Sequence, residues 1–306
     1  MAVLKKRVAV TGATGLVGSH LSRQLLKRGY DVLGLSYGQE AATEQLRADK
    51  NFSYYKADIT NFEEITAIFK DYAPYAIFHT AALLPRSQNA EALSFFATNV
   101  RGTIHVLEAC RRLGIKKIIY SSSMSVYGKE IQVLPVNETN PLRPYDFYSL
   151  TKLQGEDFCR LYSEQYGAEV IVLRYAGIYG FPRKDGVVYN FIKNAKEDKP
   201  LEISSDTSWD IIYAEDVATA NILALEKENL PSFSIFNIGS GKEIHVRELA
   251  ERIIERTNSR AKLLSCTSGP AFRFFFDISK AKEELGFSPI SLEKGLEEYV
   301  RQVTVV

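Results

Sequence analysis

The chain has 306 residues, of which 45% are hydrophobic and 25% are charged, a composition typical of folded globular proteins. Its 38 basic and 37 acidic residues give a formal net charge of +1, which excludes the basic surface needed for nucleic acid or anionic membranes. No run approaches the ~20 apolar residues of a membrane span. The cysteines Cys110, Cys159 and Cys266 are odd in number and lack metal-ligand spacing. We therefore expect a cytoplasmic protein without a metal site.

Short β-branched runs alternate with amphipathic segments along the first part of the chain. The first helical pattern ends at Lys27-Arg28-Gly29, because basic residues in a last turn followed by glycine typically stop a helix. Apolar strands separated by helices predict an α/β fold with a doubly wound parallel sheet. The predicted strands are 7–11, 31–35, 52–57, 75–80, 116–121 and 169–174.

The alternation loosens after about residue 178, which indicates a second structural unit. A strand-like run returns at 233–241, and the tail from Val246 to Val303 is mostly helical in pattern. We expect a dinucleotide-binding Rossmann domain at 1–177, to which the chain returns at about 214–242. Residues 178–213 and 243–306 would form a smaller C-terminal substrate-binding lobe.

A glycine-rich turn joins the first strand to the first helix in VAVTGATGLVGSHL. Gly12, Gly15 and Gly18 there allow a tight turn, close approach of backbone N–H groups to a pyrophosphate, and close packing of helix on strand. Such a turn can also serve packing alone. Its position at the N-terminal strand-to-helix junction of an alternating α/β chain favours dinucleotide binding.

The end of the second strand holds Ser36, where NAD-binding proteins carry an acid for the adenosine ribose. A serine does not repel the 2′-phosphate of NADP, but no basic residue follows immediately to neutralise it. We expect NAD or NADP, with a slight lean toward NADP. Asp58, after the third strand, is either an acceptor for the adenine amino group or part of a helix N-cap.

The segment YSLTK places Tyr148 and Lys152 four positions apart, on one face of a predicted helix. An unperturbed tyrosine, with a pKa near ~10, is a poor base. A lysine ammonium one turn away would stabilise the phenolate and lower that pKa. The serines at 121–123 end the fifth strand, at the sheet edge where such folds present their chemistry.

These features, in this order, resemble the extended short-chain dehydrogenase/reductase superfamily. Further family-like motifs run along nearly the whole chain: FHTAAL at 78–83, NVRGTIHVLEACRRLG at 99–114, SSSMSVYG at 121–128, RYAGIYG at 174–180, AEDVA at 214–218 and FDISKAKEELGFSP at 276–289. The branch resembled is the NAD(P)-dependent nucleotide-sugar epimerases and dehydratases, such as UDP-glucose 4-epimerase. The resemblance implies a nucleotide-sugar substrate, a homodimer, and Ser123, Tyr148 and Lys152 as the catalytic residues.

The resemblance also implies two sets of binding residues. The cofactor set is Gly12, Thr14, Gly15, Leu16, Val17, Gly18, Ser36, Asp58, Ile59, Ala81, Ala82, Asn99, Ser121, Tyr148, Lys152, Tyr175 and Ile178. The substrate set is Leu84, Ser123, Met124, Ser125, Tyr148, Gly177, Trp209 and Arg273.

Several positions depart from the family pattern. Dehydratases of this branch carry an Asp-Glu pair where this chain has Met124 and Ser125, so 4,6-dehydration is disfavoured. Gly177 and Trp209 replace an asparagine and an arginine that contact the substrate diphosphate in relatives. Trp209 could stack on a substrate or belong to the core. Arg273 could replace the lost arginine, but its register is off by about one residue.

Three functions remain open on this basis. The first is 4-epimerisation of a sugar nucleotide through a 4-keto intermediate, with Tyr148 as acid and base. The second is an NADPH-dependent ketoreductase that acts on a keto sugar or a non-sugar carbonyl, favoured by the lost diphosphate ligands. The third is a non-catalytic dinucleotide-binding regulator, which the presence of both Tyr148 and Lys152 disfavours.

Overall fold

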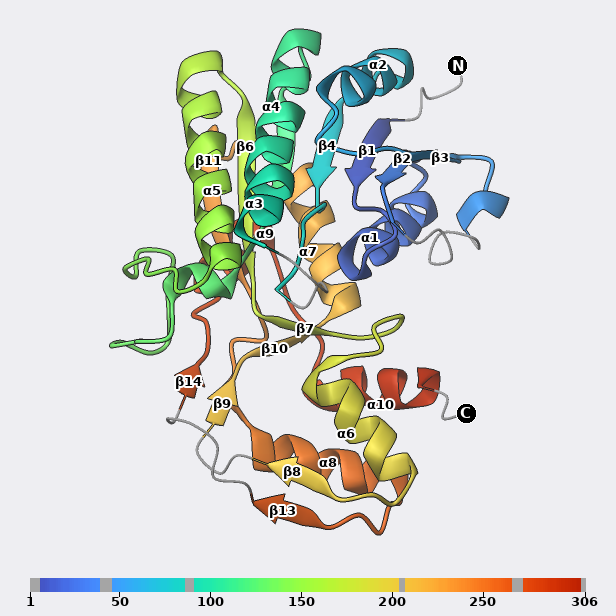
Figure 1. The fold of residues 1–306 in the computed structure, drawn as a ribbon, viewed down its shortest axis with the longest axis vertical. Coiled ribbons are helices and arrows are strands. Elements are labelled where there is room, and N and C mark those ends of the chain that lie inside the picture. The colour runs from blue at the N-terminus through green and yellow to red at the C-terminus, as the bar shows by residue number, and fades with distance from the viewer. Residues whose placement is uncertain (1–5, 39–45, 86–90, 204–206, 266–271, 304–306) are drawn as a thin grey trace.

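A seven-stranded parallel sheet forms the centre of the protein in the computed structural model, which describes residues 6–38, 46–85, 91–203, 207–265 and 272–303 (Figure 1). The strand order is β11-β6-β5-β4-β1-β2-β3, so six strands follow the 3-2-1-4-5-6 order of dinucleotide-binding domains. The six strands predicted from sequence are present within two residues of their expected ends. The strands are β1 (Arg7–Thr11), β2 (Asp31–Ser36), β3 (Phe52–Lys56), β4 (Ala76–His79), β5 (Lys117–Ser123), β6 (Glu169–Tyr175) and β11 (Phe233–Ile238).

Helices cover both faces of this sheet. On one face α1 (Leu16–Lys27), α7 (Ala214–Glu226) and α9 (Ser279–Leu285) pack in one core with Val8 and Val10 of β1. On the other face α2 (Phe62–Tyr72), α4 (Gly102–Leu113) and α5 (Phe147–Tyr166) pack in a second core with Ala9. Because alternate residues of a strand point to opposite faces, one apolar strand supplies both cores. The doubly wound fold is therefore confirmed.

A smaller unit lies beyond the end of β6 and has its own core around Ile192, Leu249 and Leu296. Its sheets are β10-β7, β12-β9-β14 and β13-β8. The predicted helical tail holds three helices and two short strands among its described residues. The elements are β7 (Gly177–Tyr179), α6 (Gly186–Lys196), β8 (Leu201–Ile203), β9 (Thr207–Trp209), β10 (Ile211–Tyr213), β12 (Ile244–His245), α8 (Val246–Thr257), β13 (Leu263–Ser265), β14 (Phe272–Phe274) and α10 (Leu292–Gln302).

Three short helical segments lie at the edge of the large sheet where its strands end. They are α3 (Ala92–Phe95), a π-helical turn at Phe96–Arg101 that continues into α4, and a 3-10 turn at Met124–Tyr127 directly after β5. A further 3-10 turn at Leu46–Ala48 precedes β3. The turn after β5 places Ser123 at its N-cap, and so fixes the direction in which this serine points.

Asp210, between β9 and β10, joins the smaller unit to the end of β11. Its fully buried carboxylate accepts hydrogen bonds from the N–H and Oγ of Ser240, 2.7 and 2.6 Å away, and from the N–H of Gly241, 3.0 Å away. Burial raises the pKa of Asp210 to about 6 although these hydrogen bonds oppose the shift. A Cβ at Gly239 would lie 2.4 Å from Asp210 Oδ2, so the glycines after β11 admit this carboxylate.

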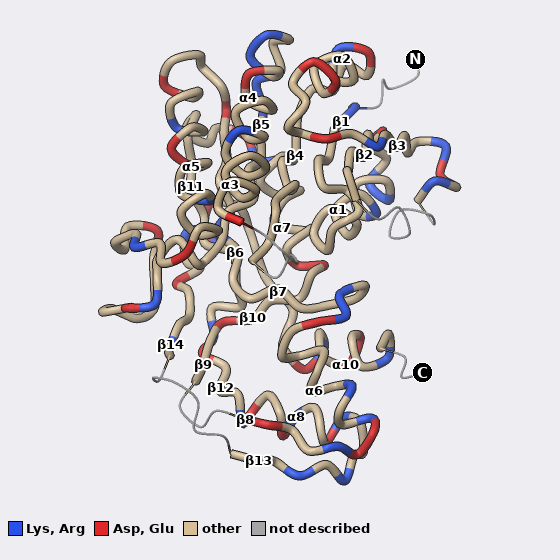
Figure 2. The backbone as a smooth tube through the Cα atoms, viewed as in Figure 1, with Lys and Arg blue, Asp and Glu red and all other residues tan. Residues whose placement is uncertain are grey.

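Basic and acidic residues are interspersed along the backbone of both the larger and the smaller unit (Figure 2). In the described part of the chain, no helix is long and apolar enough to cross a membrane. The same residues contain no cluster of three or more His, Cys, Asp or Glu side chains able to hold a metal ion. Cys110 and Cys159 are buried free thiols, and Cys266 lies outside the described residues.

Candidate active site

The glycine turn has the geometry that a bound pyrophosphate requires. Gly12 has φ +72°, and a Cβ there would lie 2.8 Å from the backbone of Ala81. A Cβ at Gly18 would lie 2.2 Å from the carbonyl oxygen of Gly12, so α1 packs directly on the turn. Gly15 is the N-cap of α1 and no side chain caps this helix end. The N–H groups of its first turn can therefore bind an anion.

Ser36 lies beside this turn, as the sequence predicts. Its Oγ is 2.6 Å from Thr14 Oγ1, which joins the end of β2 to the glycine motif. The structure also places a basic side chain next to Ser36, which could not be found among the residues that follow Ser36 in the sequence. Lys56 of β3 is in register with Ser36, and residues in register on adjacent strands share a face of the sheet. Asp58 accepts a hydrogen bond from the N–H of Thr60, 2.8 Å away, while Asn61 caps α2.

A line of buried hydrogen bonds fixes the loop after β4. The ring of His79 is 2.8 Å from Thr11 Oγ1 through Nδ1, and 3.0 Å from Thr103 Oγ1 through Nε2. Because Thr103 donates its own proton to the carbonyl of Asn99, His79 Nε2 is the donor in that contact and the ring is neutral. Burial, with the charge of Lys152, lowers the pKa of His79 to about 3. The loop from 80 to 84 is thereby held against the glycine turn.

Asn99 holds the same loop from the helical side. Its Oδ1 accepts from the N–H of Leu83 at 2.7 Å, and its Nδ2 donates to Leu83 O and Thr151 Oγ1, both at 3.1 Å. Thr151 in turn donates to the carbonyl of Tyr148. The contacts of the Asn99 side chain therefore position this loop, and a contact of Asn99 with a cofactor stays a prediction.

Ser123, Tyr148 and Lys152 meet where β5 ends and α5 begins. Ser123 donates a hydrogen bond to the Tyr148 hydroxyl, and Ser125 donates to Ser123 Oγ at 3.0 Å. Asp146 caps α5 through a capping box with Ser149, which sets the start of the helix at Phe147, one residue before Tyr148. The hydroxyl groups of 125, 123 and 148 thus form a directed chain that ends on the tyrosine oxygen.

The protonation of Tyr148 differs from the sequence-based expectation. Burial raises the pKa of Tyr148 to about 12, and the hydrogen bond from Ser123 only partly opposes this. The expected lowering by Lys152 is absent in the structure. Lys152 Nζ donates instead to the carbonyl of Ser121 at 2.7 Å and lies 5.0 Å from the centre of the Tyr120 ring. Burial lowers the pKa of Lys152 to about 8.

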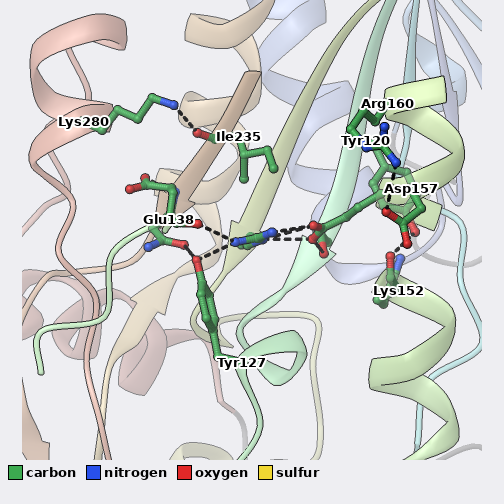
Figure 3. A network of polar contacts seen from close by, with 12 residues as sticks. Tyr120, Tyr127, Glu138, Lys152, Asp157, Arg160, Ile235 and Lys280 are labelled. Atoms are coloured by element: carbon green, nitrogen blue, oxygen red, sulfur yellow. Dashed lines mark hydrogen bonds and ion pairs between the residues drawn. The ribbon is translucent and has the colours of Figure 1, made fainter. Parts of the chain in front are cut away.

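A buried ion pair that the sequence did not reveal lies one turn further along α5. Glu156 accepts from Arg174 Nη2 at 2.6 Å and from Arg174 Nε at 3.0 Å, and also from Ser122 Oγ. Arg174 Nη1 donates to the Tyr127 hydroxyl at 2.8 Å. Figure 3 shows this network running from Tyr127 and Glu138 across the strands to the side chains near Lys152. The sequence contains one signal for the position of Glu156. Tyr148, Lys152 and Glu156 follow one another at intervals of four residues and therefore share one face of the helix.

Other predicted cofactor residues lie around this edge in varied roles. The Tyr175 hydroxyl is 3.0 Å from Ser121 Oγ and bonds to Asn221. The side chain of Ile59 packs under α4, where a Cβ at Gly102 would lie 2.7 Å from it. Leu16 and Val17 open α1, Ala82 follows Ala81 in the pinned loop, and Ile178 lies in β7 and packs against the main core.

Gly177 and Trp209, the two departures from the family pattern, are spatial neighbours. A Cβ at Gly177 would lie 3.4 Å from Trp209 Cδ1 and 3.3 Å from the carbonyl oxygen of Asp210. Trp209 is half-buried and packs against both the main core and the core of the smaller unit. The indole therefore packs beside Gly177 at ordinary van der Waals distance, and the two departures from the family pattern form one contact.

Arg273 does not share a face with Trp209. Arg273 is in register with Ser208, whereas Trp209 is in register with Phe274, so the two side chains point to opposite faces of this small sheet. The guanidinium of Arg273 forms a bidentate pair with Glu243 at 2.7 and 2.8 Å. A cavity of about 630 Å³ lies beside it, lined by Lys129, Glu130, Ile131, Gln132, Leu134, Arg273 and Phe275.

The remaining predicted substrate residues flank the catalytic serine or the pinned loop. Met124 packs against the main core from the turn after Ser123. Leu84 is exposed directly after Leu83. Met124 and Ser125 therefore follow the end of β5 directly, Leu84 lies in the loop after β4, and Gly177 and Trp209 belong to the smaller unit. Substrate contacts by these residues stay a prediction.

Fold and site together define a dinucleotide-binding enzyme of the extended short-chain dehydrogenase/reductase type. The glycine turn, the end of β2 and the Ser-Tyr-Lys group all lie at the carboxyl edge of one parallel sheet, where such folds bind nicotinamide dinucleotides. The profile of the "NAD dependent epimerase/dehydratase family" matches residues 8–239. The chain belongs to this family.

Sequence and structure comparisons agree with that assignment. The UDP-glucuronate 4-epimerase of Thermodesulfobacterium geofontis is 32% identical over 95% of this chain and 94% of its own length. The UDP-glucose 4-epimerase of Thermotoga maritima, solved with UDP-glucose, has a TM-score of 0.86 and 31% identity over 96% of this chain and 97% of that chain. The UDP-glucuronic acid 4-epimerase of Bacillus cereus was solved with UDP-glucuronic acid and NAD. It has a TM-score of 0.86 and 29% identity over 97% of this chain and 99% of that chain.

Proposed function

We propose that this enzyme interconverts the C4 epimers of a UDP-hexose or UDP-hexuronate. The observation that carries this proposal is the directed chain of hydroxyl groups from Ser125 through Ser123 to Tyr148. It lies beside a glycine turn that fits a pyrophosphate. Met124 and Ser125 supply no carboxyl group beside Ser123, so proton transfer at one carbon is the chemistry available. Relatives that act on UDP-glucose and UDP-glucuronate match nearly the whole chain.

In the proposed reaction Tyr148 removes the proton of the sugar 4-hydroxyl and Ser123 orients the same oxygen by a hydrogen bond. A bound nicotinamide dinucleotide would accept the C4 hydride and return it, and its cationic oxidised ring would favour the phenolate of Tyr148. The 4-keto sugar turns before the hydride returns to its other face, and Tyr148 gives back the proton. The glycine turn and the end of β2 would hold the dinucleotide.

The test is to incubate the purified protein separately with UDP-glucose and UDP-glucuronate and to resolve the C4 epimers by ion-exchange chromatography. We expect an equilibrium mixture of epimers without added dinucleotide. Conversion that consumes NADH or NADPH in proportion to product would favour the ketoreductase. An absence of turnover with dinucleotide bound would favour the regulator.

The choice between NAD and NADP rests on the end of β2. The relative from Bacillus cereus was solved with NAD, and the comparisons give no support to the expected lean toward NADP. The structure nevertheless places Lys56 in register with Ser36, and the guanidinium of Arg47 lies 4.4 Å over the Tyr54 ring on the same strand. We propose that the site binds NAD and also tolerates a 2′-phosphate.

Ser36→Asp should make the site discriminate against NADP, whose 2′-phosphate the wild-type site tolerates in this proposal. A carboxylate at 36 would accept the ribose hydroxyls of NAD and repel the 2′-phosphate of NADP. Like charges 4 Å apart repel by ~4 kcal/mol at an effective dielectric near 20. Solvent at this edge reduces the effect, so we expect about tenfold weaker NADP binding relative to NAD, or about 1.4 kcal/mol. Titration of both dinucleotides by calorimetry, with Ser36→Asn as the uncharged control, measures the ratio. Equal ratios of NADP to NAD affinity in Ser36→Asp and Ser36→Asn would contradict the assignment of residue 36 to the adenosine ribose.

We propose that a second copy of the chain covers an apolar surface on α3, the following π-helical turn and the start of α5. Leu93, Phe96, Phe147 and Leu150 there are 77%, 50%, 57% and 43% exposed, and burial of such a patch favours association. Sedimentation velocity at micromolar concentration tests for the homodimer. A monomer throughout that range would contradict it.

We propose the domain division expected from sequence, with one refinement. Residues 1–177 and 214–242 form the dinucleotide-binding domain, and 178–213 with 243–306 form the substrate-binding lobe. Within the second range, Ala281 and Leu285 of α9 pack in the main core with β1, so α9 fastens the lobe to the larger domain. The buried free thiols Cys110 and Cys159 support a cytoplasmic location.

A further inference from the structure

The Glu156–Arg174 pair connects every segment that carries a catalytic side chain. Glu156 lies on α5 one turn after Lys152 and two turns after Tyr148, and Arg174 lies on β6 in register with Ser122. Both side chains of the pair are almost fully buried. Ser122 donates to Glu156, while the carbonyl of the preceding residue, Ser121, accepts from Lys152. Helix α5 is therefore fastened to β5 at two successive residues.

The other end of Arg174 reaches the turn that follows Ser123. Its Nη1 donates to the Tyr127 hydroxyl at 2.8 Å and to the Glu138 carbonyl at 3.3 Å. The Tyr127 hydroxyl donates to Asn237 Oδ1 at 2.7 Å on β11. The turn from Met124 to Tyr127 is thus held at its last residue by Arg174 and at its second residue by Ser123, whose Oγ accepts from the N–H of Ser125.

Stability alone does not account for an ion pair in this position. Apolar side chains of similar volume commonly replace a buried ion pair without loss of stability, because removing two charges from water offsets their attraction. The position of this pair is more specific than its energy. It is the only buried Arg–Glu ion pair among the residues that the structure describes, and it lies on the helix face of Tyr148 and Lys152.

We propose that Glu156, clamped by Arg174, is a positioning residue of the active site that holds α5 in register and keeps Lys152 as an ammonium. Lys152 is almost fully buried and its Nζ donates to a neutral carbonyl. The other titratable or charged groups around it are His79 of β4, Tyr120 of β5, Tyr148 and Cys159 of α5, and Arg174 of β6. None of these is a carboxylate. Burial lowers the pKa of Lys152, and Cys159 and then Glu156 oppose this shift. Because burial raises the pKa of the Cys159 thiol and keeps it protonated, Glu156 supplies the negative charge.

This inference rests on one part of the proposed function, namely that Lys152 contacts the bound dinucleotide. The test measures the affinity for NAD by calorimetry from pH 6 to 10, without any sugar substrate. In the wild type the affinity should fall as the pH rises through about 8, the pKa of Lys152, and Lys152→Met should lack this transition. In Glu156→Gln the transition should lie about one pH unit lower. Glu156→Asp, which keeps the charge, should retain the wild-type midpoint.

Two further variants keep the result interpretable. Glu156→Gln/Arg174→Met removes both charges, so no guanidinium is left buried without a partner. Its midpoint should lie between those of the wild type and Glu156→Gln, because loss of the Arg174 cation offsets part of the loss of the carboxylate. Glu164→Gln removes an exposed carboxylate that pairs with Arg160 on the same helix, and its midpoint should not move. Equal midpoints in the wild type and both Glu156 charge variants would overturn the proposal, as would a wild type without the transition. Failure to epimerise UDP-sugars would contradict the proposed function and leave this result standing.

Discussion

Tyr148→Phe is expected to lower turnover by roughly 10²–10⁴-fold, the range typical for loss of a general acid–base group. The phenyl ring keeps its half-buried position at the start of α5, whereas the oxygen that receives the Ser123 hydrogen bond is lost. Because the glycine turn and the end of β2 are untouched, dinucleotide affinity should change little. Initial rates of C4 epimer formation and calorimetric titration of NAD measure the two effects separately.

The matched control for this variant is Tyr145→Phe. Tyr145 lies three residues earlier and is 49% exposed, so its hydroxyl should contribute little to turnover. A Tyr148→Phe enzyme that retained the wild-type rate would remove Tyr148 from the proposed proton transfer. A variant that lost dinucleotide binding along with turnover would show that the hydroxyl serves the cofactor site instead.

The large domain could be predicted from sequence because its signals are local and periodic. Val8, Ala9 and Val10 are all fully buried, which is the apolar run expected of a strand covered on both faces. The end of α1 and the glycine turn depend on backbone geometry that glycine alone tolerates easily. The smaller unit was harder to predict, since its strands have three residues or fewer and pair with distant segments. Such short strands carry too few residues for an alternating pattern.

The features of the site that could not be predicted from sequence depend mainly on contacts between segments that are distant in sequence. Lys56 lies beside Ser36 only because β3 pairs with β2, so no inspection of residues after 36 could find it. Gly177 and Trp209 looked like two separate losses of diphosphate ligands, whereas their contact makes them one repacking. Arg273 matched a phosphate-binding role in residue type, but its pairing with Glu243 depends on strand register. The protonation of Tyr148 likewise follows from burial, which a helical spacing does not report.

Lys152→Met should reduce turnover by roughly 10²-fold, because it removes the buried ammonium through which we propose that α5 contacts and positions the dinucleotide. The same change should not lower the thermal midpoint at pH 7. Burial lowers the pKa of Lys152 from 10.5 to about 8, so between these values the unfolded chain binds more protons and stability rises with pH. Below pH 8 the folded protein carries the full cost of the buried ammonium, roughly 3 kcal/mol. Methionine removes this cost and loses the hydrogen bond to Ser121. Scanning calorimetry at pH 7 and pH 10 measures whether Lys152→Met raises or lowers the thermal midpoint. Lys193→Met, at an exposed position, is the control. A midpoint well below wild type at pH 7 would show that the lysine stabilises the fold.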